Sequence, residues 1–548
     1  MRGIAWPLAG SLVAAWVAVP IMVVLASVGA DSDGVWAHLA STVLPGYIRN
    51  TVLLALGVAV GTFVLGVGSA WLVTMCRFPG QRVLWWALLL PLAIPAYLSA
   101  YAYSDLLQFS GPVQTGLRDA FGWIRADYWF PQVRSLGGAI AILSFGLYPY
   151  VYLASRSAFL EQSMCALEVG RTLGGGPWNG FRRIALPLAR PSIVAGLSLA
   201  LMETLAEFGA VDYLAVDTFA TGIFRTWMTR GSLTAAAQLS ACLLGLVGIL
   251  ILIERSARRR ARFFSATHRH RALATVRLRG VRGAVAAMAC ALPVVLGFAV
   301  PVLRFIDLSA TGGDRRAGEL FVELARNSML VGLTAAALAA ALALVVAYAG
   351  RLDPSPASRF TGWLAGLGYA IPGGVIAIGV LAPLTWLDHR LNDWGQAAFD
   401  FAPGLILSGS VVAVLLGYQT RFLALALSLI EAGLGRIRPS IDDAARTLGA
   451  TPGRLLRQVH VPLLRGTTFA ALALVFVEVI KELPATLILR PFNFETLAVR
   501  VYQLASDERL AEASTGALAI IAVGLVPVVI LSRLQQGARP AAADEVSE

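Results

Sequence analysis

Uninterrupted apolar runs of about 20 residues recur along the whole chain, each long enough to cross the hydrocarbon core of a bilayer as a helix. Hydrophobic residues make up 57% of the 548 residues and charged residues only 14%, whereas a typical soluble domain carries about 25% charged residues. Because backbone groups cannot stay unpaired in lipid, a spanning chain forms helices or a closed barrel. The runs show no short alternating pattern, so the sequence predicts an all-α integral membrane protein.

Twelve transmembrane helices fit these apolar runs, six on each side of an arginine-rich stretch at 254–283. That stretch is predicted to be a linker between a first transmembrane domain, 1–253, and a second, 284–548. The predicted spans are 5–29, 51–76, 83–108, 136–155, 192–214, 235–253, 284–303, 328–349, 361–385, 404–424, 467–489 and 514–532.

The excess of basic residues predicts how the chain is oriented. It carries 44 Lys and Arg against 32 Asp and Glu, a net charge of +12. Such an excess can indicate nucleic-acid binding, but these residues gather in the loops between spans, and no nucleic acid is expected as a partner. With both termini and the 254–283 linker inside, the inner loops hold about twice as many basic residues as the outer loops. Both termini are therefore predicted to be cytoplasmic.

The two halves of the chain repeat each other. Arg49-Asn50-Thr51 is matched by Arg326-Asn327-Ser328, and Ala93-Ile94-Pro95 is matched by Ala370-Ile371-Pro372. An even number of spans in each half makes the repeats parallel, related by an axis along the membrane normal. We therefore expect two parallel six-helix repeats with the substrate path between them.

A polar stretch occurs once in each half, after the fourth and the tenth predicted spans. The copies read LEVGRTLGGGPWNGFRRIALPL, from Leu167 to Leu188, and DDAARTLGATPGRLLRQVHVPL, from Asp442 to Leu463. Each predicts a short helix with an acidic residue at its start, a glycine in the left-handed conformation that ends a helix, a proline that opens a second helix, and a proline just before the next span. These residues are Glu168, Gly174, Pro177 and Pro187 in the first copy, and Asp443, Gly449, Pro452 and Pro462 in the second.

The spacing within each copy resembles the coupling-loop signature of binding-protein-dependent ATP-binding-cassette importers: Glu-Ala-Ala, three residues, Gly, nine residues, then Ile-x-Leu-Pro. The first copy reads Glu168-Val169-Gly170, Gly174 and Ile184-Ala185-Leu186-Pro187, and the second reads Asp443-Ala444-Ala445, Gly449 and Val459-His460-Val461-Pro462. A simple connection needs about 4–6 residues, so these longer stretches fit a docking role. The resemblance implies that each loop inserts a coupling helix into an ATPase, with the acidic residue helping it to dock.

The chain is not expected to contain that ATPase. A phosphate-binding loop of the form G-x-x-x-x-G-K-[ST] needs a lysine, and the single lysine, Lys481, stands in a predicted span with no glycine nearby. We therefore expect that this chain is not itself an enzyme and that it binds no cofactor. The resemblance implies two copies of a separate cytoplasmic ATP-binding-cassette ATPase, which use ATP and Mg.

The whole chain most resembles the fused, double-length permeases of iron(III) importers. The stretch VIKELPATLILRPFNFETLAVRVYQLASDE, from Val479 to Glu508, and its first-half counterpart from Glu203 to Trp227 carry this likeness. It implies ferric iron as cargo, delivered by a periplasmic iron-binding protein to a multi-pass permease among the lipids of a bacterial inner membrane. Related fused permeases carry thiamine or polyamines, so these cargoes stay open.

Five charged residues in the fifth and eleventh predicted spans are candidates for the translocation path: Glu203, Glu207, Glu478, Lys481 and Glu482. Each pair of glutamates is spaced i, i+4, which predicts that the pair lies on one helical face. A carboxylate at mid-membrane costs about 2.5–3.5 kcal/mol and usually faces a protein interior or a wet cavity. Carboxylate oxygens suit a hard cation, but a conduit must bind weakly, and no metal site is predicted. In the alternative interpretation, Lys481 neutralises one glutamate and the others hold helices together.

Two other classes of protein stay open. A proton-coupled secondary transporter can also use twelve spans in two parallel halves with membrane carboxylates, although it has no need of two docking loops. A membrane scaffold or sensor can use such loops, but it has no need of a hydrophilic path between the fifth and eleventh spans.

Overall fold

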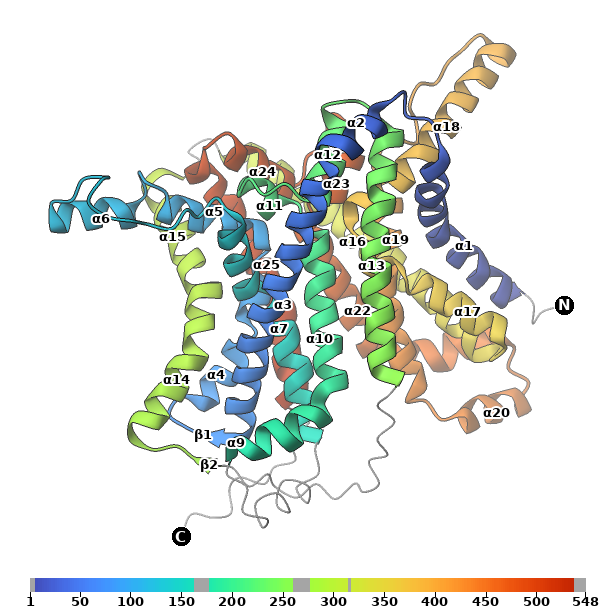
Figure 1. Ribbon diagram of the computed structural model, residues 1–548. Coiled ribbons are helices and arrows are strands. Elements are labelled where there is room, and N and C mark those ends of the chain that lie inside the picture. The colour runs from blue at the N-terminus through green and yellow to red at the C-terminus, as the bar shows by residue number, and fades with distance from the viewer. Residues whose placement is uncertain (1–4, 162–176, 260–275, 314–316, 537–548) are drawn as a thin grey trace. The chain divides into compact units, whose positions relative to one another are not determined.

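Helices dominate the computed structural model, which describes residues 5–161, 177–259, 276–313 and 317–536 (Figure 1). Within these residues, ten helices are long and apolar enough to cross a membrane, or twelve if each of two bent helix pairs forms one span. The strands β1 (Cys76–Arg77) and β2 (Val276–Arg277) form a short parallel pair. The predicted all-α membrane fold is confirmed.

The long helices are α1 (Ala5–Ala26), α3 (Leu44–Met75), α7 (Leu136–Glu161), α10 (Leu186–Ala206), α13 (Leu233–Arg259), α14 (Gly280–Val294), α15 (Val300–Gly312), α16 (Ala317–Leu352), α18 (Gly373–Phe399), α19 (Val411–Gly435), α22 (Val461–Lys481) and α25 (Leu510–Gln536). The shorter helices are α2 (Val35–Thr42), α4 (Gln81–Ala87), α5 (Ala96–Leu107), α6 (Pro112–Phe121), α9 (Pro177–Gly180), α11 (Gly209–Tyr213), α12 (Phe219–Met228), α17 (Pro356–Ala365), α20 (Pro439–Thr447), α21 (Pro452–Leu455), α23 (Pro484–Leu489) and α24 (Leu497–Ser506).

The chain folds into two compact units, and each unit takes segments from both sequence halves. Unit 1 comprises Met1–Pro45, Phe219–Leu244 and Asp314–Glu508, and unit 2 comprises Gly46–Thr218, Gly245–Gly313 and Arg509–Glu548. Within unit 1, α1 packs against α16, α17 and α18; within unit 2, α14 packs against α4 and α15 against α5 and α25. Each half therefore gives its first helix to the unit built mainly from the other half.

Matched residues of the two halves make the same contacts within their own units. The side-chain amide of Asn50 donates to the Asp217 carbonyl at 2.9 Å, and that of Asn327 donates to the Glu495 carbonyl at 3.4 Å. These two asparagines belong to the repeated Arg-Asn-Thr/Ser segments. The sequence repeat is thus also a repeat of hydrogen bonds, which tie the start of a long helix to the loop after the fifth span of each half.

The third and ninth predicted spans are broken helices. Helical segments Gln81–Ala93 and Ala96–Phe121 meet at 92°, and segments Pro356–Ala370 and Gly373–Phe399 meet at 114°. Both breaks fall at the repeated Ala-Ile-Pro segment. The isoleucine takes an extended conformation there, as the ring of a following proline requires.

The spans that follow the two polar stretches begin earlier than predicted. They run over Phe181–Ala206 and Pro452–Lys481 rather than 192–214 and 467–489, so Pro187 and Pro462 lie inside continuous helices. A π-helical turn, Phe181–Ala185 or Leu456–His460, precedes each proline. Such a wide turn lets the helix continue past a residue that has no backbone N–H to donate.

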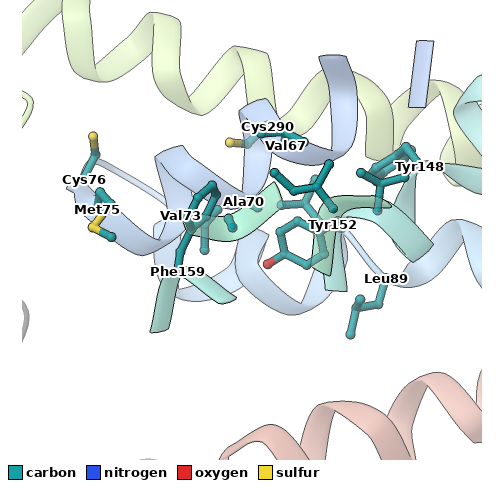
Figure 2. Close-up of a cluster of buried hydrophobic side chains, with 14 of the residues drawn as sticks. Val67, Ala70, Val73, Met75, Cys76, Leu89, Tyr148, Tyr152, Phe159 and Cys290 are labelled. Atoms are coloured by element: carbon teal, nitrogen blue, oxygen red, sulfur yellow. The ribbon is translucent and has the colours of Figure 1, made fainter. Parts of the chain in front are cut away.

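A cluster of buried hydrophobic side chains in unit 2 forms where α3, α7, α10 and α14 meet (Figure 2). Tyr152 of α7 is buried there, and its hydroxyl donates to the Trp85 carbonyl at 2.7 Å, which satisfies its polar atom. A Cβ at Gly66 of α3 would lie 2.7 Å from Cβ of Val151, closer than side chains tolerate. Glycine therefore sets the close approach of α3 and α7, as small residues do between membrane helices.

Candidate functional site

The second polar stretch forms a short helix, α20, at the end of unit 1 away from α23 and α24 (Figure 1). Gly449 follows it with a φ of +79°, so the predicted left-handed conformation is confirmed. The Gly449 amide donates to the Arg446 carbonyl at 2.9 Å, and the Ala450 amide donates to the Ala445 carbonyl at 3.0 Å. These two bonds are the Schellman pattern that ends a helix. They fix the corner after α20.

The corner leads directly into the stem of the next span. Pro452 opens α21, as predicted, and the hydroxyl oxygen of Thr451 accepts a hydrogen bond from the Arg454 amide at 3.4 Å. The Tyr348 hydroxyl of α16 donates to the Pro452 carbonyl at 2.7 Å. The corner is therefore attached to α16 as well as to its own helix.

The outward face of α20 and the residue that follows it expose apolar side chains among polar ones. Leu448 is 86% exposed and Ile441 is 40% exposed, and Ala444 between them is exposed as well, with Ala445 half-buried. The side chain of Asp443 is 71% exposed and stands 3.7 Å from Arg446. Because α20 begins at Pro439, Asp443 lies in the middle of the helix and not at its start, which corrects the prediction. Exposed apolar side chains beside small alanines and an exposed carboxylate suit a protein partner that comes close to the helix.

The inward face of α20 holds one buried carboxylate, Asp442. Its Oδ2 lies 2.7 Å from Nε of Arg351, its Oδ1 lies 3.1 Å from Nη2 of the same guanidinium, and Nε2 of His460 lies 3.2 Å from Oδ1. Arg351 also donates to the carbonyls of Leu434 at 2.6 Å and Ile437 at 2.9 Å. Two parallel bonds to one carboxylate make this a strong pair.

Asp442, Arg351 and His460 are here called the latch. Arg351 is in the last turn of α16, Leu434 in the last turn of α19, and His460 in the stem that continues into α22. Through the bonds of Arg351 the latch ties α20 to the ends of α16 and α19, and it places Asp442 against His460 in the stem of α22. Sequence reasoning missed it, because the spacing of the signature selected Asp443. The sequence feature that could have indicated the latch is Arg351, because a charged residue at the end of a long apolar run needs a partner.

The first polar stretch lies partly outside the described residues. Glu168 and Gly174 fall there, so their predicted roles stay predictions. At the positions that match the latch, the sequence has Thr74, Leu167 and Ala185. None of these can form an ion pair, so the latch has no counterpart at the matched positions of the first half.

An aromatic contact is found where Tyr348 anchors the corner in the second half. Trp71, at the position that matches Tyr348, has its ring 4.9 Å from that of Phe181 and 5.6 Å from that of Phe159. The stem that holds Pro187 is thus packed by rings. The stem that holds Pro462 has the Tyr348 hydrogen bond as well as a ring contact, because the ring of Tyr348 lies 5.5 Å from that of His460.

The structure corrects the prediction that each pair of glutamates shares a helical face. Helix α10 ends at Ala206 and α22 ends at Lys481, and both Glu207 and Glu482 have extended backbones. Glu203 and Glu478 therefore lie on the helices, while the second glutamate of each pair lies in the break that follows. The breaks are stable because the glutamate side chains accept hydrogen bonds from the first turn of the next helix.

These capping bonds have the same form in both halves. Glu207 accepts from the Ala210 amide at 2.8 Å, at the start of α11. Glu482 accepts from the Ala485 and Thr486 amides, both at 3.0 Å, and from the Thr486 hydroxyl at 2.7 Å, at the start of α23. A carboxylate beside the first amides of a helix is favourable because those amides have no partner inside the helix.

Both second-half carboxylates are paired with cations. Nζ of Lys481 lies 2.8 Å from Glu478, in agreement with the alternative interpretation of this lysine, and Nη1 of Arg421 lies 3.3 Å from Glu482. A Cβ at Gly373 would collide with the guanidinium of Arg421, so glycine at the start of α18 leaves room for the pair. Over the described residues, the protein has no group of three or more His, Cys, Asp or Glu placed to hold a metal ion.

The sequence model of the family described as "Binding-protein-dependent transport system inner membrane component" matches residues 64–263 and again residues 339–541. The chain belongs to this family. Two matches in one chain confirm the predicted pair of repeats and the fused, double-length arrangement. The permease is therefore a multi-pass protein of the bacterial inner membrane, and it works with an ATPase and a periplasmic binding protein. It is not itself an enzyme.

Known permeases resemble this one over different lengths. The Fe(3+)-transport system permease protein FbpB 2 of Haemophilus influenzae is 27% identical over 89% of both chains. The probable ABC transporter permease protein y4fN of Sinorhizobium fredii is 24% identical over 90% of this permease and 88% of its own length. The molybdenum transport system permease protein ModB of Escherichia coli is 32% identical, over 34% of this permease and 82% of its own length.

Proposed function

We propose that this permease carries ferric iron, delivered by a periplasmic iron-binding protein, across the inner membrane into the cytoplasm. The likeness to FbpB 2 is the observation that carries the proposal, because it extends over 89% of both chains. The likeness to ModB covers only 34% of this permease. A full-length likeness includes both halves of the transport path and therefore bears on the cargo. A likeness over one half reflects mainly the fold that the family shares.

Two copies of the ATPase dock on the two polar stretches. The outward face of α20, with Leu448, Ala444 and Asp443, supports this role in the second half, and Gly449 directs that face by ending the helix. Glu168 and Gly174 have the corresponding roles in the first half. The positive-inside rule supports a cytoplasmic location for both stretches, both termini and the 254–283 linker.

The latch transmits the movement of a docked ATPase to the transmembrane helices. Because Asp442 is buried, bonded to Arg351 and packed 3.2 Å from His460, a displacement of α20 acts on the ends of α16 and α19 and on the stem of α22. Helix α22 leads to the break at Glu482. Docking and the charged region of the path are thus connected through one helix.

The charged residues at the helix breaks form a weak cation path. Glu203 and Glu207 in the first half, and Glu478 and Glu482 in the second, supply carboxylate oxygens, which suit a hard cation. Lys481 and Arg421 neutralise the second pair. A passage with partly neutralised carboxylates binds iron weakly and can release it, as a conduit requires.

An oxyanion is the second candidate cargo. Two observations favour it: the cations of Lys481 and Arg421 lie beside the break after α22, and ModB shares one repeat with this permease. Basic side chains along a path favour anions. Thiamine and polyamines remain further candidates for the same class of importer.

Reconstituted transport complexes test the proposal. The permease and its ATPase are placed in nanodiscs, and ATP hydrolysis is measured with binding proteins loaded with ferric iron, molybdate, thiamine or spermidine. We expect the iron-loaded binding protein to stimulate hydrolysis and the others to leave it at the basal rate. Stimulation by a different cargo overturns the assignment of iron. Uptake that continues without any ATPase overturns the importer mechanism in favour of a proton-coupled transporter.

A further inference from the structure

The loop after α5 encloses some of its polar side chains. This first lobe comprises residues 108–130, between α5 and α7. Gln114 of α6 is buried; its amide donates to the Leu107 carbonyl at 2.8 Å, and its carbonyl oxygen accepts from the Tyr128 hydroxyl at 2.8 Å. Arg118 donates to the Phe109 carbonyl at 2.9 Å and to the Tyr128 hydroxyl at 3.1 Å. The centre of the lobe is thus a satisfied polar network.

Large apolar side chains form the outside of the first lobe. Trp129 is 85% exposed, and the rings of Phe121, Trp123 and Tyr128 stack in series with centroids 4.7 and 5.6 Å apart. Other exposed apolar residues of the lobe are Phe109, Val113 and Ile124. In water this arrangement is unfavourable, because apolar surface is exposed while groups that water could solvate are inside.

The matched loop of the second half has the same inverted arrangement. This second lobe comprises residues 386–408 of unit 1. Asp388 of α18 is fully buried and accepts from the amides of Leu407 at 2.9 Å and Ser408 at 2.8 Å, and from the Ser408 hydroxyl at 2.6 Å. Asn392 adds a pair of hydrogen bonds with the backbone of Gly404. Here too the buried polar groups are satisfied, while other polar residues of the lobe, such as Asp393, are exposed.

Aromatic residues again cover the outside of the second lobe. Trp394 is 62% exposed and contacts the ring of Phe399 at 5.3 Å, and the guanidinium of Arg390 lies 5.5 Å from the ring of Trp386. Other exposed apolar residues are Phe401, Leu405 and Ile406. In the first lobe, Arg118 lies 4.2 Å over Phe109 in the same way.

We propose that both lobes are seated in the membrane interface, with their apolar side chains at the boundary between head groups and acyl chains. Each lobe begins within the second segment of a broken span and continues beyond it, so the chain itself holds both lobes near the membrane surface. Tryptophan, tyrosine and ring-stacked arginine are the side chains that occupy this boundary. The two lobes share this chemistry although their sequences differ, GPVQTGLRDAFGWIRADYWF against WLDHRLNDWGQAAFDFAPGL. Insertion into a bilayer interface requires exposed apolar and aromatic side chains but no particular backbone fold, so two lobes of different sequence can both meet this requirement.

The orientation of α6 within unit 2 supports the same proposal. Figure 1 shows α6 lying across the direction of α3 and α7, at the end of unit 2 away from β1 and α9. Val113 and Phe121 are eight residues apart and share one face of α6 with Leu117, whereas Asp119 lies on the opposite face. An amphipathic helix in this position buries its apolar face in the interface and keeps its acidic face in water. The assignment to the outer leaflet rests on the proposed orientation of the permease.

Spin labels measure whether the lobes are in lipid. In a variant without the native cysteines, single cysteines replace Ile124 or Trp129 in the first lobe and Trp394 in the second, and the full permease is placed in nanodiscs. Asp119→Cys on the opposite face of α6, and Asp393→Cys beside Trp394, are the matched controls. We expect labels at the three apolar positions to collide with oxygen in preference to a water-soluble nickel chelate, at depths of about 5–10 Å below the phosphates. The control labels should prefer the nickel chelate.

Adding the binding protein distinguishes burial of the lobes in lipid from burial against a protein partner. We expect the nickel accessibility of all three apolar positions to stay unchanged when cargo-loaded binding protein is added. Labels that are open to water, and then become protected by the binding protein, would overturn the proposal and assign the lobes to that partner. Labels that stay open to water under both conditions would also overturn it. A failure of iron to stimulate ATP hydrolysis would leave the first measurement unaffected, because the accessibility of the labels in the permease alone is measured without cargo.

Discussion

Replacing Asp442 by asparagine removes the only carboxylate of the latch and leaves Arg351 inside unit 1. The two side chains are 9% and 14% exposed, so the pair is buried. Breaking a buried pair by removing one partner costs about 3–5 kcal/mol. Arg351 keeps its bonds to the carbonyls of Leu434 and Ile437, so we expect the lower value, about 3 kcal/mol.

This free-energy cost weakens the attachment of α20 to unit 1, and it does not destabilise the membrane-spanning helices. A loss of about 3 kcal/mol raises the population of detached α20 by roughly 100-fold, since 1.36 kcal/mol is a factor of ten. Tryptic cleavage after Arg446 measures that population when opening is fast relative to cleavage. We therefore expect cleavage in permease-only proteoliposomes to accelerate by up to about 100-fold, and stimulation of ATP hydrolysis by the loaded binding protein to be lost.

Two variants control this experiment. Asp443→Asn changes the neighbouring, exposed carboxylate, and should alter cleavage little because an exposed pair contributes about 0–1 kcal/mol. The triple change Arg351→Thr, Asp442→Leu and His460→Ala gives the latch the residues of the first half. It should hold α20 better than Asp442→Asn does, because it leaves no charge buried. The reasoning is refuted if Asp442→Asn cleaves and couples like the parent, or if Asp443→Asn is equally damaging.

Three further expectations can be measured in the same preparations. Gly449→Val forces a β-branched residue to a φ of +79° and should abolish stimulated ATP hydrolysis, whereas Gly453→Val at an open helical position should keep most of it. Glu203→Gln should reduce iron uptake without reducing the amount of permease in the membrane; unchanged uptake would assign this glutamate to packing. Single cysteines at 270 and 311 should react with impermeant reagents only from the cytoplasmic and the outer side, respectively, and same-side labelling would contradict the proposed orientation.

Features that depend on local sequence could be predicted from it. Continuous apolar runs locate the spans, because lipid permits only helices there. The conformation of Gly449 was predictable as well, because a glycine at the end of a polar helix in Arg-Thr-Leu-Gly fits the left-handed cap. The Ala-Ile-Pro segments were recognised as repeats, although their effect, a sharp break in each span, was not.

Features that depend on distant partners could not be predicted in the same way. Whether Asp442 or Asp443 is buried is decided by Arg351, which is 91 positions away in the sequence. The end of α22 at Lys481 is fixed by hydrogen bonds that Glu482 makes with α23 and by its contact with Arg421. The i, i+4 spacing of Glu478 and Glu482 predicts a shared helical face only if the helix is continuous between them. The exchange of first helices between the units likewise follows from packing between helices.

Uptake of radiolabelled ferric iron into proteoliposomes that contain the permease, its ATPase and its binding protein tests the central claim most directly. We predict that iron accumulates inside only with ATP and the loaded binding protein, and that the Gly449→Val permease accumulates none. Accumulation of molybdate, thiamine or spermidine in place of iron, or of iron without ATP, would contradict the account.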